Sequence, residues 1–217
     1  MKKKIALLLK GINSTVNLHN SEIPLNLGEN EYKKLDVDFF RCYSNMKKNL
    51  IDPLGDQFDL KIYLSTYKSD SLNKINSILN PEKVILNNLD NHPLQTFING
   101  LEAIVDVDYV IPYRFDALLH KNYNELDIDY SFVNFPWREA NHWKTIRGVG
   151  DLIFLYPFLF NQKFIISLKS CIKKESVHRI YDEMKNISDV SKFRFITNEM
   201  CNIFNNPIGT IDRVKVL

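Results

Sequence analysis

The chain has 217 residues, of which 45% are hydrophobic and 12% aromatic, and its 28 lysines and arginines nearly balance 26 aspartates and glutamates. A hydrophobic fraction of this size supplies a globular core and excludes intrinsic disorder. The net charge of +2 argues against a dedicated nucleic-acid-binding protein, which normally carries a strong basic excess. The three cysteines form no CxxC pair, so we expect neither a structural zinc site nor a disulfide framework, and we expect a reducing, cytoplasmic location.

The N-terminal segment carries three lysines followed by the apolar run Ile5–Leu9. This pattern resembles the start of a signal peptide, but the run is too short for a secretory core. No stretch of about 18 apolar residues elsewhere predicts a membrane span. A short continuous apolar run is typical of a strand covered on both faces, and Gly11 then begins a loop. We therefore predict a buried first strand.

Short apolar runs along the rest of the chain alternate with segments of helical spacing. The predicted strands cover residues 59–65, 83–86, 109–112 and 131–135. The predicted helices cover residues 32–52 (ended by Pro53), 70–79, 94–105 and 171–185, with an irregular loop at 16–30 and a strand followed by a helix at 151–160. This alternation predicts one α/β domain over residues 1–217 with a mostly parallel central sheet.

In such a sheet, ligands bind at the carboxyl ends of the strands. The candidate loops are therefore 11–15, 66–69 and 113–116. Several α/β chemistries lack their signatures here. The sequence has no GxxxxGK[ST], no GxGxxG after the first strand, no GxSxG and no HExxH, which disfavours P-loop kinases, NAD enzymes, α/β-hydrolases and zinc proteases of those types.

Acidic residues at strand ends remain as candidates for the chemistry. Asp106 and Asp108 form a DxD tripeptide, but it precedes the strand at 109–112, whereas Arg114 and Asp116 follow that strand. We favour Asp116 on position, because a carboxylate there can hold a divalent cation against a diphosphate and an arginine beside it can bind phosphate. The alternative is an ordinary surface ion pair, which contributes little to stability.

A second acidic candidate is Asp151, which follows two glycines at 148 and 150. The glycines allow close backbone approach, so that the carboxylate can project into a site. The alternative is a plain turn in which Asp151 caps a helix. Trp137 and Trp143 lie among polar and charged residues, an arrangement that suits sugar binding through an aromatic face. Half-buried tryptophan packing explains the same pattern equally well.

The order of these features is similar to a known family. The segments IALLLKGI, FDLKIYLSTY, DYVIPYRFDALL and GVGDLIF together resemble small GT-A-type glycosyltransferases, as found in capsule loci and large DNA viruses. In those proteins an R-x-D element stands where other members have DxD. The resemblance covers roughly residues 3–160 and rests on order and pattern. One departure is that Asn13 and Ser14 stand where the family has an arginine soon after the first strand.

The resemblance implies a GT-A-like, Rossmann-type three-layer sandwich that moves a sugar from a nucleotide diphosphate sugar to an acceptor hydroxyl on a glycan. The implied donor-binding residues are Gly11, Ile12, Asn13, Thr66, Tyr67, Arg114 and Asp116. Asp116 would be the ligand of a Mn²⁺ or Mg²⁺ ion. Asp151 is the implied catalytic base, with Glu139 second, and Trp137, Arg138 and Trp143 are the candidate acceptor-binding residues.

Two functional hypotheses follow. The first is the metal-dependent glycosyltransferase, with no nucleic-acid partner and no membrane span; the sequence leaves open whether transfer inverts or retains the anomeric centre. The second is a non-catalytic α/β module that binds a nucleotide or a glycan. Only a catalyst would also cleave the donor, so donor hydrolysis separates the two.

Overall fold

The computed structural model describes residues 2–11, 35–36, 38–88, 91–174, 176–202, 205–211 and 214–215. The sequence-predicted loop at 16–30 lies outside the described residues, as do Ile12 and Asn13. Within the described part of the chain, no helix is long and apolar enough to cross a membrane.

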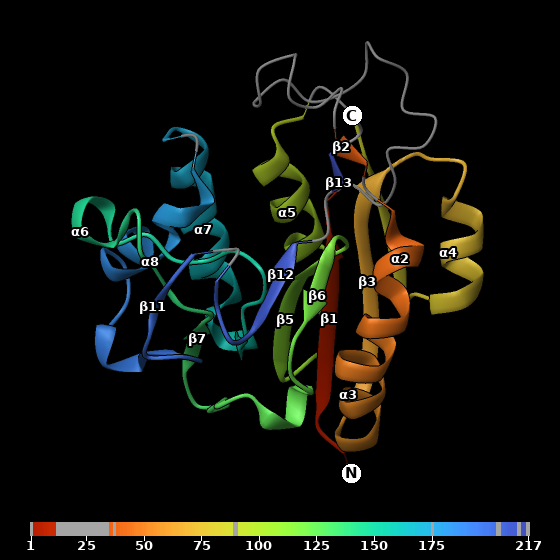
Figure 1. Ribbon diagram of the computed structural model, residues 1–217, viewed down its shortest axis with the longest axis horizontal. Helices are drawn as coiled ribbons and strands as arrows, with labels where there is room; N and C mark the ends of the chain where they lie inside the picture. Colours follow the sequence, from red (N-terminus) through yellow and green to blue (C-terminus); the bar gives the residue numbers. More distant parts are fainter. Residues whose placement is uncertain are drawn as a thin grey trace.

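A five-stranded sheet forms the centre of the molecule, in the order β4-β3-β1-β5-β9 (Figure 1). Its strands are β1 (Lys4–Lys10), β3 (Asp59–Tyr67), β4 (Lys83–Asn87), β5 (Tyr109–Arg114) and β9 (Tyr156–Pro157). The first four run parallel, and β9 pairs antiparallel with β5. The predicted α/β class with a mostly parallel central sheet is therefore confirmed.

The strand order reverses beside β1. From β1 the chain moves outward to β3 and β4, then returns to place β5 on the other side of β1. The carboxyl ends of β1 and β5 therefore flank a topological switch point, where open α/β sheets commonly bind ligands. Lys10 and Arg114 are paired in register at that edge.

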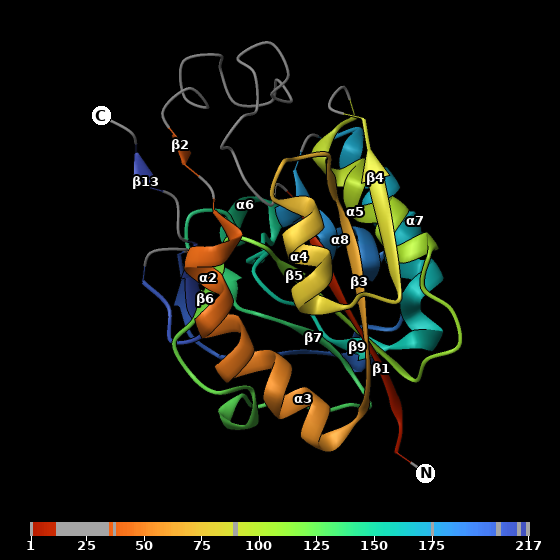
Figure 2. The same cartoon turned by 90° about the vertical axis from the view of Figure 1, so that its right-hand side faces the viewer.

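Helices cover both faces of the sheet, and Figure 2 shows α2 and α3 on one side and α5 and α7 on the other. The larger helical elements are α2 (Phe39–Met46), η1 (Lys47–Ile51), α3 (Asp52–Gln57), α4 (Leu72–Leu79), α5 (Pro93–Glu102), α7 (Asn161–Ile172) and α8 (Ile180–Lys185). On β1, Ile5, Leu7 and Leu9 enter the core shared with α2 to α4. Ala6 and Leu8 enter the core shared with α5 and α7, which explains the unbroken apolar run.

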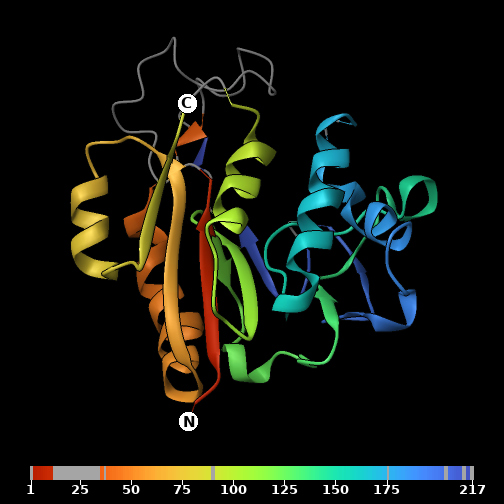
Figure 3. The ribbon, with the colours of Figure 1, turned by 180° about the vertical axis from the view of Figure 1, so that it is seen from behind.

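Shorter elements complete the described chain. They are β2 (Leu35–Asp36), β6 (Ala117–Leu119), η2 (Tyr123–Glu125), β7 (Val133–Phe135), β8 (Arg138–Glu139), α6 (Trp143–Ile146), η3 (Phe158–Phe160), η4 (Val177–Arg179), η5 (Val190–Lys192), β10 (Phe193–Phe195), β11 (Met200–Cys201), β12 (Gly209–Ile211) and β13 (Val214–Lys215). The strands among these shorter elements form two-stranded sheets: β10 with β7, β11 with β8, β12 with β6 and β13 with β2. Figure 3 shows α7 and α8, in shades of blue, beyond the β5 side of the sheet, whereas β13 lies beside β2 near the C-terminus.

Both predicted boundaries of the helix expected over 32–52 were wrong. The helix expected over 32–52 begins at Phe39, where Asp38 caps it by accepting a hydrogen bond from the Phe40 amide at 2.9 Å. It also passes Pro53, because a π-helical turn precedes that residue and places it in the first turn of α3, where a missing N–H is tolerated. Positions 32–34 and 37 of that prediction lie outside the described residues.

The helix expected over 171–185 is two helices instead. α7 ends at Ile172 and α8 starts at Ile180, so that Cys171 and Met184 enter the same core. The strand expected over 131–135 exists as β7, but it pairs with β10 outside the central sheet. The edge position of that sheet belongs to β9, at the end of the segment that carries Asp151.

Candidate active site

Three side chains form a buried ion-pair cluster at the carboxyl end of β5. Arg114 donates to both carboxylate oxygens of Asp116, from Nε at 2.8 Å and from Nη2 at 2.9 Å. Its Nη1 donates to Oδ2 of Asp151 at 2.7 Å. The exposed fractions of the three side chains are 15%, 6% and 12%, respectively. The strand end thus holds one cation between two carboxylates, out of bulk water, a setting in which charge pairs interact strongly.

Local pairing beside β5 brings Asp151 to this cluster. Tyr113 bridges Ile153 in antiparallel fashion, and the Phe154 amide donates to the Pro112 carbonyl at 3.1 Å. Asp151 therefore lies alongside the end of β5, although it is 37 residues from Arg114 in the sequence. It caps no helix, so the cap alternative from the sequence does not apply.

The cluster shifts the titration of its members. Burial by itself raises the pKa of Asp151, but the nearby positive charges of Arg114, Lys10 and His178 outweigh burial and hold that pKa well below its usual range. Burial likewise lowers the pKa of Arg114, and the two carboxylates more than reverse this effect. Asp151 is consequently a weak proton acceptor while it stays paired with Arg114.

The first loop begins beside the cluster. Gly11 has a φ of 105°, a left-handed conformation that favours glycine. Its amide donates to the Ser65 carbonyl at 3.1 Å, and the Thr66 hydroxyl donates to its carbonyl at 2.8 Å. The Lys10 ammonium lies 4.5 Å from the centroid of the Phe97 ring. The start of the loop is thus anchored to the end of β3.

Two of the predicted donor-binding side chains are enclosed in the protein. Thr66 is fully buried and Tyr67 is only 3% exposed. Thr66 holds the loop backbone at Gly11, and the Tyr67 hydroxyl accepts a hydrogen bond from Thr96 at 2.9 Å. Thr66 thus supports the start of the loop, whereas Tyr67 contacts α5. Their predicted direct contact with a donor would require the side chains to become exposed.

Trp137 is also enclosed, which corrects its prediction as an aromatic platform for the acceptor. The ring is 0% exposed, and its Nε1 donates to Oε2 of Glu139 at 3.1 Å. The backbone at Gly150 passes so close that an added Cβ would stand 2.4 Å from the indole. The ring therefore positions Glu139 and the segment before Asp151 and offers no free face to a sugar.

His178 is a further residue near Asp151 that the sequence did not indicate as part of the site. Its Nδ1 lies 2.7 Å from the Val149 carbonyl, and the Val149 amide donates to the His178 carbonyl at 3.0 Å. Because a carbonyl only accepts, Nδ1 carries the hydrogen and Nε2 of a neutral ring keeps its lone pair. The His142 ring lies 5.8 Å away between centroids. An isolated histidine in the sequence gave no signal for this position.

Arg138 and Trp143, the other two predicted acceptor residues, do lie together. The Arg138 guanidinium carbon is 5.3 Å from the centroid of the Trp143 ring and 4.3 Å from that of Phe195. Trp143 is half-buried against Tyr181 and Phe195. Arg138, Tyr181 and Phe195 line a pocket that is separate from the ion-paired cluster, and Trp143 packs behind Phe195.

The donor set around Asp116 does not fit a divalent cation in this arrangement. Both oxygens of Asp116 and one of Asp151 accept hydrogen bonds from Arg114. In the described part of the chain, no group of three or more His, Cys, Asp or Glu side chains gathers closely enough to hold a metal ion. Hard cations such as Mg²⁺ need several oxygen ligands, so Arg114 supplies the positive charge that the carboxylates require here.

The fold and this site define an α/β protein with an ion-paired polar centre at the switch point of its sheet. No family model matches the chain, and no curated protein matches it. Among solved structures, the chain is similar to the crystal structure of the glycosyltransferase GlyE of Streptococcus pneumoniae. The TM-score is 0.48 and the identity 10%, over 90% of this chain and 45% of that chain, so this chain spans less than half the length of that protein.

Proposed function

We propose that the protein is a glycosyltransferase that moves a sugar from a nucleotide diphosphate sugar to an acceptor hydroxyl on a glycan. The observation that supports this most is the buried cluster of Arg114, Asp116 and Asp151 at the carboxyl end of β5. It contains the R-x-D element, which is one of the features in the family resemblance, and it stands at the switch point where α/β sheets commonly bind ligands.

In the proposed reaction, the acceptor oxygen bonds to the anomeric carbon of the donor sugar. The bond from that carbon to the diphosphate oxygen breaks, and its electron pair leaves with the nucleoside diphosphate. The proton of the acceptor hydroxyl passes to a carboxylate if the transfer inverts. A retaining transfer would need no such base.

Two carboxylates are candidates for the base, and the geometry ranks Glu139 ahead of Asp151. Asp151 is tied to Arg114, which lowers its pKa and with it its basicity. Glu139 receives a neutral indole N–H from Trp137 and, among the described residues, no ion pair. We therefore propose Glu139 as the base that accepts the proton of the acceptor hydroxyl. The proposed role of Asp151 is to hold Arg114, which in turn pairs with Asp116.

A second candidate function is a non-catalytic module that binds a nucleotide or a glycan. The observation that favours it is that the guanidinium N–H groups of Arg114 directed at the cluster are already engaged by protein carboxylates. A centre of this kind can stabilise a fold without any chemistry. The requirement for Mn²⁺ or Mg²⁺ stays a prediction under the first function.

Donor binding and donor cleavage separate the two functions. The melting temperature is measured with UDP-, GDP- and TDP-sugars, each with and without Mn²⁺, since a ligand that binds only the native state raises it. Release of nucleoside diphosphate is then measured with the donor that stabilises most. A transferase releases it, and a binding module shows the shift alone. No shift with any donor would contradict both nucleotide-based functions.

The base assignment is tested with Glu139→Gln and Asp151→Asn. If Glu139 takes the proton, Glu139→Gln should lower transfer about 10²–10⁴-fold and leave the donor-induced shift intact. Asp151→Asn serves as the comparison, and it should affect stability more than the rate per folded molecule. Full transfer by Glu139→Gln, with a large loss in Asp151→Asn, would return the assignment to Asp151.

A further inference from the structure

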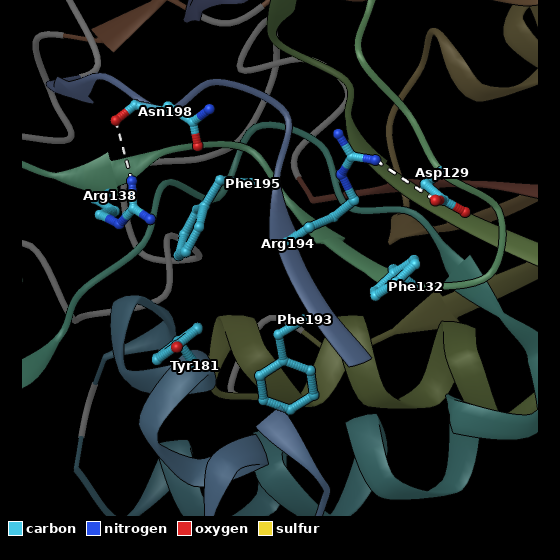
Figure 4. A pocket seen from close by; sticks show the side chains of 8 residues that line it. All are labelled: Asp129, Phe132, Arg138, Tyr181, Phe193, Arg194, Phe195 and Asn198. Atoms are coloured by element: carbon cyan, nitrogen blue, oxygen red, sulfur yellow. Dashed lines mark hydrogen bonds and ion pairs between the residues drawn. The ribbon is translucent and has the colours of Figure 1, made fainter. Parts of the chain in front are cut away.

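A pocket of about 420 Å³ opens beside β10, on the C-terminal side of the molecule (Figure 4). Its lining consists of four aromatic residues, two arginines, one aspartate and one asparagine: Phe132, Tyr181, Phe193, Phe195, Arg138, Arg194, Asp129 and Asn198. The volume falls within the roughly 300–1,000 Å³ of small-ligand sites. None of the ends of β1, β3 and β5 contributes to it, so it is separate from the ion-paired cluster.

Three of the rings in the pocket, those of Tyr181, Phe193 and Phe195, pack against one another. Tyr181 stacks on Phe195 with centroids 5.6 Å apart, and Phe193 meets Tyr181 edge-on at 5.7 Å. Trp143 packs behind them, 5.5 Å from Phe195. Phe195 is 8% exposed, whereas Phe193 and Tyr181 are half-buried. Ring faces of this kind pack against the apolar C–H surface of a sugar.

The two arginines of the pocket differ in how their charge is balanced. Arg194 pairs with Asp127, Nη2 to Oδ2 at 2.6 Å, and with Asp129, Nη1 to Oδ2 at 3.6 Å. Arg138 donates one hydrogen bond, from Nη1 to the Asn198 carbonyl at 3.0 Å. Within the described residues, no carboxylate pairs with Arg138. A guanidinium has five N–H donors, so Arg138 has capacity for an anion.

We propose that this pocket binds a carboxylate-bearing sugar of the glycan acceptor, with the rings against the sugar face and Arg138 on the carboxylate. The inference rests on the proposed glycosyltransferase function and names the class of its acceptor. A planar guanidinium suits a carboxylate because two parallel N–H bonds match its two oxygens. Stacking on Phe195 holds the guanidinium in place. Paired Arg194 sets the opposite wall.

The pocket is joined to the candidate base through β8. Arg138 and Glu139 are the two residues of that strand, and successive residues of a strand point to opposite sides. Glu139 turns to Trp137 in the core, and Arg138 turns to the pocket. An acceptor sugar on Arg138 would therefore lie beside β8, on the side opposite the Glu139 carboxylate, so the pocket would hold a sugar of the acceptor other than the one that reacts.

The test measures the binding of defined oligosaccharides to the full chain without any donor. The acidic probe is a tetrasaccharide that alternates glucuronic acid and N-acetylglucosamine, and the neutral probe is a glucose tetrasaccharide. Titration calorimetry reports affinity. Both tryptophans contribute to the fluorescence, and a change on addition of ligand is assigned to Trp143, which packs against Phe195 of the pocket, because Trp137 is fully buried. Arg138→Gln removes the charge from the pocket. Arg147→Gln is the matched control, because Arg147 also lies near Trp143, at 5.9 Å, but does not line the pocket.

We expect the acidic probe to bind more tightly than the neutral one and to perturb the fluorescence of Trp143. Arg138→Gln should weaken acidic-probe binding about tenfold or more, and Arg147→Gln should leave it near wild type. No binding of the acidic probe, equal binding of both probes, or an unchanged Arg138→Gln would overturn the inference. So would equal binding of a glutamate-rich peptide. Donor-induced shifts of the melting temperature are measured in parallel. A donor-induced shift without binding of the acidic probe would contradict the pocket inference alone, whereas the absence of any donor-induced shift would contradict the transferase function.

Discussion

Arg114 balances the negative charge of two buried carboxylates, those of Asp116 and Asp151. Removing one partner of a buried ion pair leaves uncompensated charge, and this costs more than the intact pair contributes. Arg114→Gln would leave Asp116 and Asp151 facing each other without the guanidinium between them. Two like charges that are buried close together destabilise the folded state, or force one carboxylate to take up a proton.

We therefore predict that Arg114→Gln lowers the free energy of unfolding by about 3–5 kcal/mol. Denaturant unfolding at neutral pH measures it. The control is Lys169→Gln, which removes the cation of the Lys169–Glu102 pair, whose side chains are 53% and 47% exposed. That change should cost about 0–1 kcal/mol. Equal effects of the two substitutions would show that the cluster contributes no more than a surface pair.

A second residue-scale prediction concerns acid. The pKa of Asp151 is below its ordinary value in the folded chain and returns to about 3.9 in the unfolded chain. Between those values the unfolded state binds more protons, so stability is present above about pH 4 and is lost as the pH falls. Urea unfolding of wild type and Asp151→Asn from about pH 7 to about pH 3 tests this. Their difference in stability should shrink in acid, and a constant difference would refute the linkage.

At the scale of elements, the crossing of residues 148–151 over Trp137 holds the site together. The crossing works only because position 150 lacks a side chain, since a Cβ there would meet the buried indole at 2.4–2.7 Å. The indole in turn donates to Glu139, and the next residue after Gly150 is Asp151. One close approach therefore fixes the positions of both carboxylates that are candidates for the base.

Gly150→Ala should accordingly destabilise the protein by about 1–3 kcal/mol, because an added methyl group in a packed core forces shifts. It should also lower transfer per folded molecule if Glu139 acts as proposed. Gly55→Ala is the control: it lies exposed in α3, with nothing within 4 Å of the added Cβ. There, alanine should stabilise by about 0.5–1 kcal/mol. Wild-type stability and turnover in Gly150→Ala would contradict the role given to the crossing.

Local patterns in the sequence were sufficient for the strands and insufficient for the site. The runs at 5–9 and 109–112 are continuous and apolar because helices cover both faces, and together with the segment at 59–65 they are strands of the central sheet. The R-x-D residues were correctly placed at a strand end. Asp151 joins them through long-range contacts, such as the pairing of Ile153 with Tyr113, and no local signal reports such a contact.

The errors made at Pro53 and Trp137 also arise from contacts between residues far apart in the sequence. Pro53 was taken as a helix end, but the π-helical turn before it places it in the first turn of α3, and residues of α2, this turn and α3 pack into one core. Trp137 was equally compatible with a platform and with core packing, and only the path of residues 148–150 decided for the core. Long-range contacts, which a single sequence does not display, account for both.

At the scale of the whole molecule, β1 belongs to two hydrophobic cores at once. Leu7 packs with α2 to α4 on one face of the sheet, and Leu8 packs with α5 and α7 on the other. Both side chains are 0% exposed. A single strand that fills both cores couples them, so we expect the described layers to unfold together as one cooperative unit, in accord with the single domain predicted over residues 1–217.

Leu7→Ala and Leu8→Ala test this coupling one core at a time. Each should lower the free energy of unfolding by about 2–5 kcal/mol, since each removes buried methyl groups and leaves a cavity. In each variant, far-UV circular dichroism and tryptophan fluorescence should follow one coincident transition, shifted as a whole. Trp137 belongs to the first core and Trp143 packs against the second, so fluorescence samples both. Two separate transitions, with each substitution moving only one of them, would mean that the faces of the sheet fold independently.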